Sequence, residues 1–472
     1  MSVAAYDLVA IGSGPAGQRA AVQAAKLGKT AAIVEQAATL GGASTNTGTV
    51  PSKTLRAAAL ELTGLAHGVY TSAYRISDAI TAADLLWRAR QVIEHEREVI
   101  RDQLRRNRID ILTGTASFLD AHTLEIRAAD ATYRVAGQRF VIAVGTTPVR
   151  PQGVDFDEST VVDSDGILRL GSIPRTLTVV GGGVIGLEYA SIAAALGTSV
   201  TVVDKRERLL DFVDAEIVEA LRYHLRGLGV VFRLGEEVDA VGRHPEGGAV
   251  THLRSGKQIP SDVVLYAAGR QGATAGLALA AAGLQADRRG QIVVGPDYST
   301  AQPHIYAAGD VIGFPSLAAT SMEQGRLAAL AAFGQPARSV PELLPYGIYT
   351  IPEVSFVGRT EHELTRAAVP YVAGFGRYRE VVRGEISGDR TGLLKLLVHV
   401  RTRKLLGVHI LGTAASELVH IGQTAMAGGL TLDYLLEAVF NVPTLADAYK
   451  VAALDAANRL NEIAAHRTEA VA

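Results

Sequence analysis

The sequence predicts an α/β fold that contains two Rossmann-like, doubly wound parallel sheets and ends in an α+β domain. Residues 7–35 and 177–204 form an internal repeat, in which an apolar run, a Gly-x-Gly-x-x-Gly turn, an Ala-rich stretch, a second apolar run and an acidic residue follow one another. Strand–helix–strand units of this kind build parallel sheets. After about residue 345, short alternating strands and a helical end replace this pattern, which favours an α+β arrangement there.

The two copies of the repeat agree in their spacing, because Gly12 precedes Glu35 by 23 positions and Gly181 precedes Asp204 by the same number. In such turns the three glycines permit a tight turn, close approach of the backbone to a pyrophosphate, and close packing of the helix. They are Gly12, Gly14 and Gly17 in the first copy and Gly181, Gly183 and Gly186 in the second. The acidic residue ends the second strand, where a carboxylate can bind ribose hydroxyls. Two turns with equal spacing predict two dinucleotides, most economically FAD with NAD(H) or NADP(H), which exchange hydride directly.

Composition and charge exclude several classes of function. The 472-residue chain has no cysteine, which excludes disulfides, thiolate metal sites and cysteine nucleophiles. Its net charge is −2 and it has no basic block, so nucleic acid is not expected as a partner. No apolar run reaches about 18 residues and the N-terminus lacks a basic signal region, so we expect a cytoplasmic protein that does not enter a membrane. The 12 histidines form no spaced cluster, and no metal is predicted.

Four further motifs are distributed along the chain. They are GGASTNTGTVPSK at 41–53, AVGTTP at 143–148, AAGD at 307–310 and VPTLAD at 442–447. With these motifs, in this order, the chain resembles the flavin-dependent pyridine nucleotide:disulfide oxidoreductases over essentially its whole length. The resemblance implies a homodimer whose chain divides into four segments. They are a FAD-binding domain in residues 1–150, an NAD(P)-binding domain in 151–275, a second FAD-binding part in 276–345 and a dimerisation domain in 346–472.

The chain departs from that family where its thiol chemistry would lie. The two redox cysteines of the family correspond to Ser44 and Thr49, and a hydroxyl can neither form nor attack a disulfide. The acid–base histidine of the C-terminal motif corresponds to Val442, and the glutamate that follows it corresponds to Asp447. Both halves of the thiol machinery are therefore absent, so reduction of lipoamide or glutathione disulfide is not expected.

One branch of the family, the soluble pyridine nucleotide transhydrogenases, fits these departures better. The similarity is carried by residues 161–168, 301–318, 346–358 and 440–454. It implies a ping-pong reaction in which NADPH reduces FAD, NADP+ leaves, and NAD+ takes the hydride. Two alternatives stay open: an NAD(P)H diaphorase or oxidase that passes electrons to quinone or oxygen, and a catalytically idle binding subunit.

The resemblance also implies roles for charged residues. Lys53 would lie near N5 of the flavin and stabilise its reduced form, and Glu188 would pair with this lysine and contact the nicotinamide. Asp310 would bind the ribitol of FAD, and Asp447 would reach the site of the partner subunit. Without the resemblance, Lys53 reads as a solvated lysine at a helix start and Glu188 as an exposed helix charge. The other cofactor-binding residues that the resemblance implies are Gly42, Ser44, Gly114, Ala116, Gly145, Gly269 and Ala318.

The segment after the second repeat predicts use of both nicotinamide dinucleotides. Asp204 is placed to bind the ribose 2′-hydroxyl of NAD, whereas Lys205 and Arg206 are placed to bind the 2′-phosphate of NADP. The plain alternative is a solvated charge run at the end of a strand.

Overall fold

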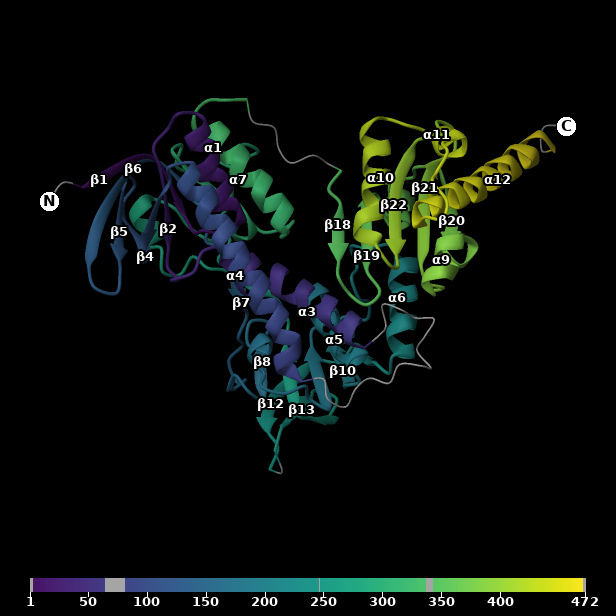
Figure 1. The fold of residues 1–472 in the computed structure, drawn as a ribbon, viewed down its shortest axis with the longest axis horizontal. Coiled ribbons are helices and arrows are strands. Elements are labelled where there is room, and N and C mark those ends of the chain that lie inside the picture. Colours follow the sequence, from purple (N-terminus) through teal and green to yellow (C-terminus); the bar gives the residue numbers. More distant parts are fainter. Residues whose placement is uncertain (1–2, 64–80, 246, 337–342, 470–472) are drawn as a thin grey trace.

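The computed structural model describes residues 3–63, 81–245, 247–336 and 343–469, and these form three lobes (Figure 1). An N-terminal lobe is built around the first copy of the repeat and a second lobe around the other copy. The C-terminal residues build the third lobe.

The first copy of the repeat forms the centre of the N-terminal lobe. β1 (Ala4–Ile11) pairs in parallel with β2 (Ala31–Glu35) and β6 (Thr132–Ile142), and α1 (Pro15–Lys26) connects β1 to β2. β17 (Ile305–Ala307) joins the same sheet beside β6. The other strands are β3 (Asp110–Thr113), β4 (Thr115–Asp120) and β5 (Thr123–Arg127). Both faces of the central strands are covered, which explains why β1 is a continuous apolar run.

The second copy forms a fully parallel five-stranded sheet in the second lobe. β9 (Thr176–Val180) leads through α5 (Val184–Ala195) into β10 (Ser199–Asp204), and α6 (Ala215–Gly227) packs on the same core. The order is β11-β10-β9-β15-β8. The remaining strands of this sheet are β8 (Val161–Asp163), β11 (Val231–Leu234) and β15 (Val263–Tyr266). A small antiparallel sheet beside it contains β12 (Val238–Arg243), β13 (Ala249–Leu253) and β14 (Gln258–Ser261).

A long helix connects the first two lobes. The charged, periodic stretch at residues 83–107, a pattern typical of an exposed helix, forms α4 (Ala82–Arg106). Thr81 and Asp84 begin it with a reciprocal capping box. In Figure 1, α4 extends from the N-terminal lobe towards the second lobe. The helices that pack against it are α2 (Gly42–Asn46) and α3 (Thr49–Leu62).

The C-terminal lobe has a five-stranded antiparallel sheet with helices, as the α+β prediction requires. Its order is β18-β19-β22-β21-β20. The strands are β18 (Tyr346–Ile348), β19 (Val354–Gly358), β20 (Tyr371–Arg377), β21 (Leu393–His399) and β22 (Leu405–Leu411). The principal helices of this lobe are α10 (Ala415–Ala427) and α12 (Ala448–Glu469). α12 lies so close to β20 that a Cβ at Gly374 or Gly376 would come within 2.2 Å of a carbonyl oxygen of α12. Glycine at these two positions therefore permits the packing.

These three sheets confirm the predicted fold class. A two-stranded ribbon, β7 (Thr146–Pro148) with β16 (Arg270–Gly272), lies where the chain passes between the first two lobes. The residues at which the domains meet stay a prediction. Among the described helices, none is long and apolar enough to cross a bilayer.

A buried lysine joins the C-terminal sheet to the second lobe. Lys395 of β21 is fully buried, and its ammonium donates to Asp214 at 2.8 Å, Glu216 at 2.6 Å and Glu361 at 2.7 Å. Asp214 is also the N-cap of α6, so one carboxylate both begins a helix of the second lobe and binds a strand of the third. Burial works against the charge, but the carboxylates raise the pKa of Lys395 above its ordinary value. The three carboxylates lie close enough to hold a cation, and the lysine supplies it.

Replacing Lys395 by methionine should strongly destabilise the chain, because three carboxylates would then face one another without a cation. Breaking a buried ion pair costs about 3–5 kcal/mol. We expect a loss of that size in the free energy of unfolding at neutral pH, measured by urea denaturation. Burial works against it, but contacts that include Lys395 hold the pKa of the Asp214 carboxyl below its ordinary value. The loss should therefore shrink as the pH falls, because Asp214 then accepts a proton and no longer stabilises the ammonium in the wild type. The matched control is Lys257→Met, which removes a lysine that is paired with Glu236 at the surface and should cost less than about 1 kcal/mol. Equal losses for the two variants would contradict the role of Lys395.

Candidate functional site

The carboxyl ends of the two parallel sheets meet at one large cavity. Its volume is about 1480 Å³, and its wall includes both glycine turns, most of residues 42–53, and Tyr346 and Tyr349 of the C-terminal lobe. In open α/β sheets, ligands bind in crevices of this kind beyond the strand ends. All three lobes therefore contribute to one site.

The first glycine turn is held by its acidic residue. The backbone N–H and the hydroxyl of Ser13 both donate to Oε2 of Glu35, at 2.9 and 2.6 Å, and the N–H of Ala37 donates to Oε1 at 2.9 Å. Gly12 has a φ of +108°, and a Cβ on Gly17 would lie 1.9 Å from the carbonyl oxygen of Gly12. These positions therefore require glycine.

The second turn has the same backbone conformation, but different donors bind its acidic residue. Gly181 also has a φ of +108°, and a Cβ on Gly186 would lie 1.9 Å from its carbonyl oxygen. The N–H of Gly182 donates to Oδ2 of Asp204 at 2.7 Å. The middle glycine of each turn faces open space, because a Cβ on Gly14 or Gly183 would meet no described atom within 4 Å. Both cradles thus leave room for a group in front of a helix N-terminus, where anions bind.

The acidic residue of the second turn is bound by an arginine of the same segment. Arg206 donates from Nε to Oδ1 of Asp204 at 3.1 Å, from Nη2 to Oδ2 at 2.8 Å, and from its backbone N–H to Oδ1 at 2.8 Å. Burial works against it, but these bonds hold the pKa of the Asp204 carboxyl below its ordinary value. Lys205 is exposed on the cavity wall. The structure therefore brings Asp204 and Arg206 together as a pair, where the sequence suggested separate functions.

Lys53 and Glu188, 135 positions apart, form an ion pair on the wall of the cavity. The ammonium donates to Oε2 of Glu188 at 2.8 Å and to Oε1 at 3.0 Å, and it lies 3.3 Å from the hydroxyl of Ser52. The side chain of Glu188 is 5% exposed and that of Lys53 is 28% exposed. The plain reading of Glu188 as an exposed helix charge is therefore wrong, and Lys53 is not a free surface lysine.

A buried carboxyl group lies at the start of the segment that follows β17. Asp310 begins a short 3₁₀ turn (Asp310–Ile312), and Ser321 of α7 (Ala318–Ala332) donates to it at 3.3 Å. Burial raises the pKa of Asp310 above its ordinary value. A carboxyl group with so little internal support fits a ligand that brings hydroxyl donors.

Most of the predicted residues meet in the cavity. Those that line it are Gly12, Gly14, Glu35, Gly42, Ser44, Lys53, Gly114, Ala116, Gly145, Gly181, Gly183, Glu188, Asp204, Lys205, Arg206, Gly269, Asp310 and Ala318. Gly17 and Gly186 instead lie behind the turns, where they admit the helices. Asp447 lies in a 3₁₀ turn of the C-terminal lobe (Leu445–Asp447) and is not among the residues of the cavity wall. Its role in the partner's site stays a prediction.

Sequence reasoning missed two residues of the cavity wall. Arg270 donates to the hydroxyl and the carbonyl oxygen of Thr146, at 2.9 and 2.8 Å, where the chain passes between the first two lobes. It directly follows Gly269, so the strand ending in AAGR was the available signal. Tyr349 contacts Lys53 and Glu188 from the C-terminal lobe, and the available signal was its place in residues 346–358, which carry part of the resemblance.

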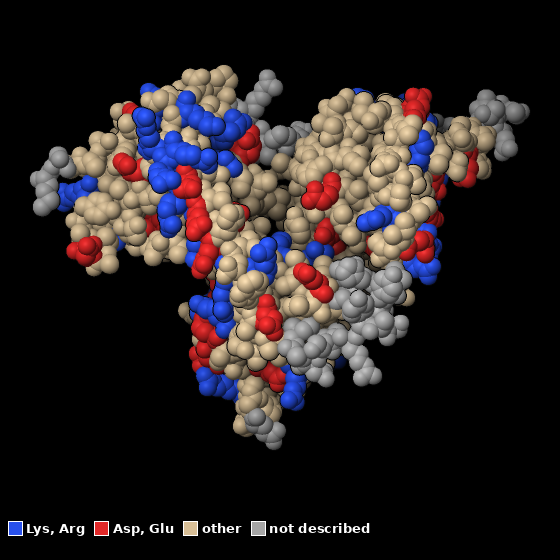
Figure 2. Space-filling model, in the orientation of Figure 1, with Lys and Arg blue, Asp and Glu red and all other residues tan. Residues whose placement is uncertain are grey.

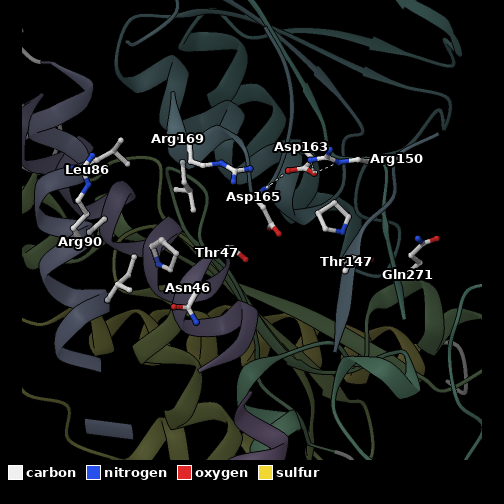
Figure 3. Close-up of a pocket in the computed structure, with 15 residues that line it drawn as sticks. Asn46, Thr47, Leu86, Arg90, Thr147, Arg150, Asp163, Asp165, Arg169 and Gln271 are labelled. Atoms are coloured by element: carbon white, nitrogen blue, oxygen red, sulfur yellow. Dashed lines mark hydrogen bonds and ion pairs between the residues drawn. The ribbon is translucent and has the colours of Figure 1, made fainter. Parts of the chain in front are cut away.

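A second cavity of about 660 Å³ adjoins the first (Figure 3). Leu86 and Arg90 of α4 form one side, and Asp163 with its partner Arg150 lies on another. Asn46, Thr47, Thr147, Pro148 and Asp165 line both cavities. The smaller cavity is thus a side chamber beside the segment in which cysteines are replaced.

Comparisons with known proteins agree with this geometry. The family model described as pyridine nucleotide-disulphide oxidoreductase matches residues 6–325, and the model of its dimerisation domain matches residues 344–453. The chain is 57% identical over 461 residues to the soluble pyridine nucleotide transhydrogenase of Mycobacterium tuberculosis, covering 97% of this chain and 98% of that one. It is 43% identical to the protein of the same name from Salmonella gallinarum, over 96% of this chain and 98% of the other.

Among solved structures, the Cu(II) complex of the HOCl-induced flavoprotein disulfide reductase RclA from Escherichia coli is similar. Its TM-score is 0.87 at 28% identity, over 96% of this chain and 99% of that chain. The similarity that the motifs indicated is thus confirmed by independent comparisons of sequence and of structure. The chain belongs to the pyridine nucleotide-disulphide oxidoreductase family.

Proposed function

We propose that this protein is a FAD-dependent NAD(P)+ transhydrogenase that moves hydride from NADPH to NAD+. One observation carries the proposal: a single cavity joins two dinucleotide cradles in a chain of 472 residues without any cysteine. Because a thiol relay is impossible, hydride taken from one nicotinamide must pass to another acceptor that reaches the same cavity. The names of the relatives from M. tuberculosis and S. gallinarum support a second nicotinamide as that acceptor.

The residues of the first cradle fit FAD. Three of the about four acceptor positions of the Glu35 carboxylate are used inside the protein, which leaves one for a ribose hydroxyl. Asp310 would accept from the ribitol chain, and Gly114 and Ala116 would flank the adenine. When bound there, FAD supplies the carrier that accepts a hydride from one nicotinamide and releases it to the next.

Lys53 and Glu188 are the residues that we place at the transfer position. A fixed ammonium on the wall of a partly closed cavity stabilises negative charge that develops near it more strongly than water would. Glu188 holds that ammonium with two short contacts and is itself shielded from solvent. The pair therefore supplies a charge whose position does not have to be organised during the reaction.

The second cradle would serve both nicotinamide dinucleotides in turn, in a ping-pong sequence. All of the about four acceptor positions of Asp204 are taken, one by Gly182 and three by Arg206. The ribose of NAD can bind Asp204 only if the guanidinium moves away. The 2′-phosphate of NADP can instead attract the same guanidinium, whose planar fork suits phosphate. One arginine would thus adapt the pocket to either substrate.

We further propose a homodimer formed through the C-terminal lobe, located in the cytoplasm. The dimerisation model of the family covers this lobe. In Figure 2 the visible face of the lobe is largely uncharged, and Val439 and Val442 are 98% and 57% exposed. Large exposed apolar side chains in one region indicate an interface. Asp447 lies a few residues further on and would reach the partner's site.

The proposed location in the cytoplasm agrees with the absence of cysteine, which fits a reducing compartment.

A diaphorase that reduces quinone is the second candidate, and the side chamber favours it. Pro51, Leu86 and Ile93 give this chamber apolar surface beside the first turn of α3. An idle binding subunit is disfavoured, because the ammonium of Lys53 stays partly exposed to the cavity, where a bound ligand can reach it.

The FAD-loaded protein should transfer hydride from NADPH to thio-NAD+ and should not reduce lipoamide or glutathione disulfide. The reason is that Ser44, Thr49 and Val442 offer neither a thiol nor its base. Absorbance at the thio-NADH band measures the transfer, with a quinone assay in parallel. Faster turnover of quinone than of thio-NAD+ would favour the diaphorase instead.

The second turn should set the choice between nicotinamides. Arg206→Ala combined with Lys205→Ala should weaken NADPH by roughly tenfold to a hundredfold, since a charge-assisted bond is worth about 1.5–3 kcal/mol. Binding of NADH should be retained, because Asp204 is freed for the ribose. Asp204→Ala should instead weaken binding of NADH and retain binding of NADPH. Arg208→Ala, in the same exposed run but outside the cavity wall, is the control. Equal changes of both KM values would rule out a selective role.

Sedimentation equilibrium at micromolar concentration should give about twice the chain mass of 49.6 kDa. Val439→Asp with Val442→Asp should shift the protein towards monomer, because a charge would be buried at the proposed interface. Val293→Asp, at an exposed position of the N-terminal lobe, should leave the dimer intact. A wild-type protein that sediments as a monomer would refute the dimer.

A further inference from the structure

Tyr349 reaches the Lys53–Glu188 pair from the C-terminal lobe. It directly follows β18, and its ring centroid lies 4.9 Å from the ammonium nitrogen of Lys53. Its backbone N–H donates to Oε1 of Glu188 at 2.9 Å. One residue therefore touches both members of the pair, the cation with its ring and the carboxylate with its backbone.

The segment that carries Tyr349 is fastened to the helices on which the pair is mounted. On α3, Arg56 donates from Nε to the carbonyl oxygen of Thr350 at 2.9 Å and forms an ion pair with Glu353 at 3.0 Å. On α5, the hydroxyl of Ser191 accepts from the N–H of Ile351 at 3.1 Å. The segment that follows Tyr349 is thus tied to both helices of the pair, which fixes the backbone from which the ring extends towards the ammonium.

The contacts and exposure of the Lys53 ammonium indicate what the ring of Tyr349 does. Lys53 is partly exposed to the cavity, whereas Glu188 is buried. The described contacts of the ammonium are the carboxylate, the hydroxyl of Ser52 and the ring of Tyr349. A cation is attracted to an aromatic face, and more strongly where water is excluded. The ring thus adds a second attraction that restricts where the ammonium can lie.

We propose that Tyr349 is a positioning residue for hydride transfer, which acts by fixing the ammonium of Lys53 on the cavity wall. Through Tyr349, the dimerisation domain would set the position of the charge at the transfer site. This inference rests on the proposed function of Lys53. It involves no proton or electron on the tyrosine, so the ring and not the hydroxyl is the active part.

The test compares Tyr349→Phe, Tyr349→Leu and Tyr349→Met in the full-length, FAD-loaded protein. Stopped-flow absorbance gives the rate constant of flavin reduction by NADPH, and equilibration with redox dyes gives the flavin midpoint potential without any nicotinamide. Tyr349→Phe should behave as the wild type, because the aromatic face is kept. Tyr349→Leu and Tyr349→Met should each lower the rate constant by about tenfold and make the potential more negative. Tyr223→Leu, at an 82% exposed position of α6, should change neither quantity.

A double-mutant cycle shows whether Tyr349 acts through Lys53. In the Lys53→Met background, removal of the ring should have no further effect on the potential. Full additivity would overturn the proposal, as would a Phe variant impaired as severely as Leu. If the Tyr349→Leu protein does not fold, the Tyr349→Met protein, which keeps more of the side-chain length, is compared with the wild type instead. Because the potential is measured without nicotinamide, a protein that lacks transhydrogenase activity still gives a decisive result.

Discussion

Burial of the Glu188 carboxylate is the constraint on which the rest of the site depends. Glu188 is the single charged residue of α5, a helix whose other residues are apolar or small and mostly buried. A buried carboxylate costs several kcal/mol unless a cation and hydrogen-bond donors compensate it. Lys53 comes from α3, which packs against both α4 and α5, and the N–H of Tyr349 comes from the C-terminal lobe. The carboxylate is therefore compensated only when α3 and the C-terminal lobe are both packed against the second lobe, so the proposed transfer site exists only in the complete fold.

The two glycine turns show how one backbone motif can serve two different kinds of ligand. At the first turn, the hydroxyl of Ser13 bonds Glu35 and also accepts from the N–H of Gly41, so the turn is tied to the segment that leads to α3. At the second turn the same position is Gly182, and the acidic residue is satisfied by the side chain of Arg206 instead. The donors to Glu35 are backbone N–H groups and the short side chain of Ser13, which the turn itself holds in place. The long side chain of Arg206, by contrast, can rotate away from Asp204. The first turn suits a resident cofactor, and the second suits substrates that enter and leave.

Features that depend on local spacing could be predicted from the sequence, and those that depend on distant contacts could not. The repeat, its turns and α4 follow from periodicity within about 30 residues. The cluster around Lys395 joins residues up to 181 positions apart, so no local pattern marks it. Surface charge behaves in the same way. The sequence has no basic block, yet Figure 2 shows lysines and arginines gathered over the N-terminal lobe. One hint was available for Glu188, because its apolar neighbours in GVIGLEYA favour burial.

The replaced cysteines change the chemistry while the segment around them keeps its structural function. Asn46 holds this segment, since its amide donates to the carbonyl oxygens of Leu40 and Gly42 and its Oδ1 accepts from Arg97 at 2.8 Å. None of these bonds needs a thiol. The same segment leads into the first turn of α3, which places Lys53 opposite Glu188. The segment therefore has a structural function without thiols, because the position of the ammonium depends on it. What the loss removes is the exit for electrons through a disulfide. Under the proposed function, donor and acceptor use the same cavity in succession, and Arg206 would adapt the second cradle to each of them.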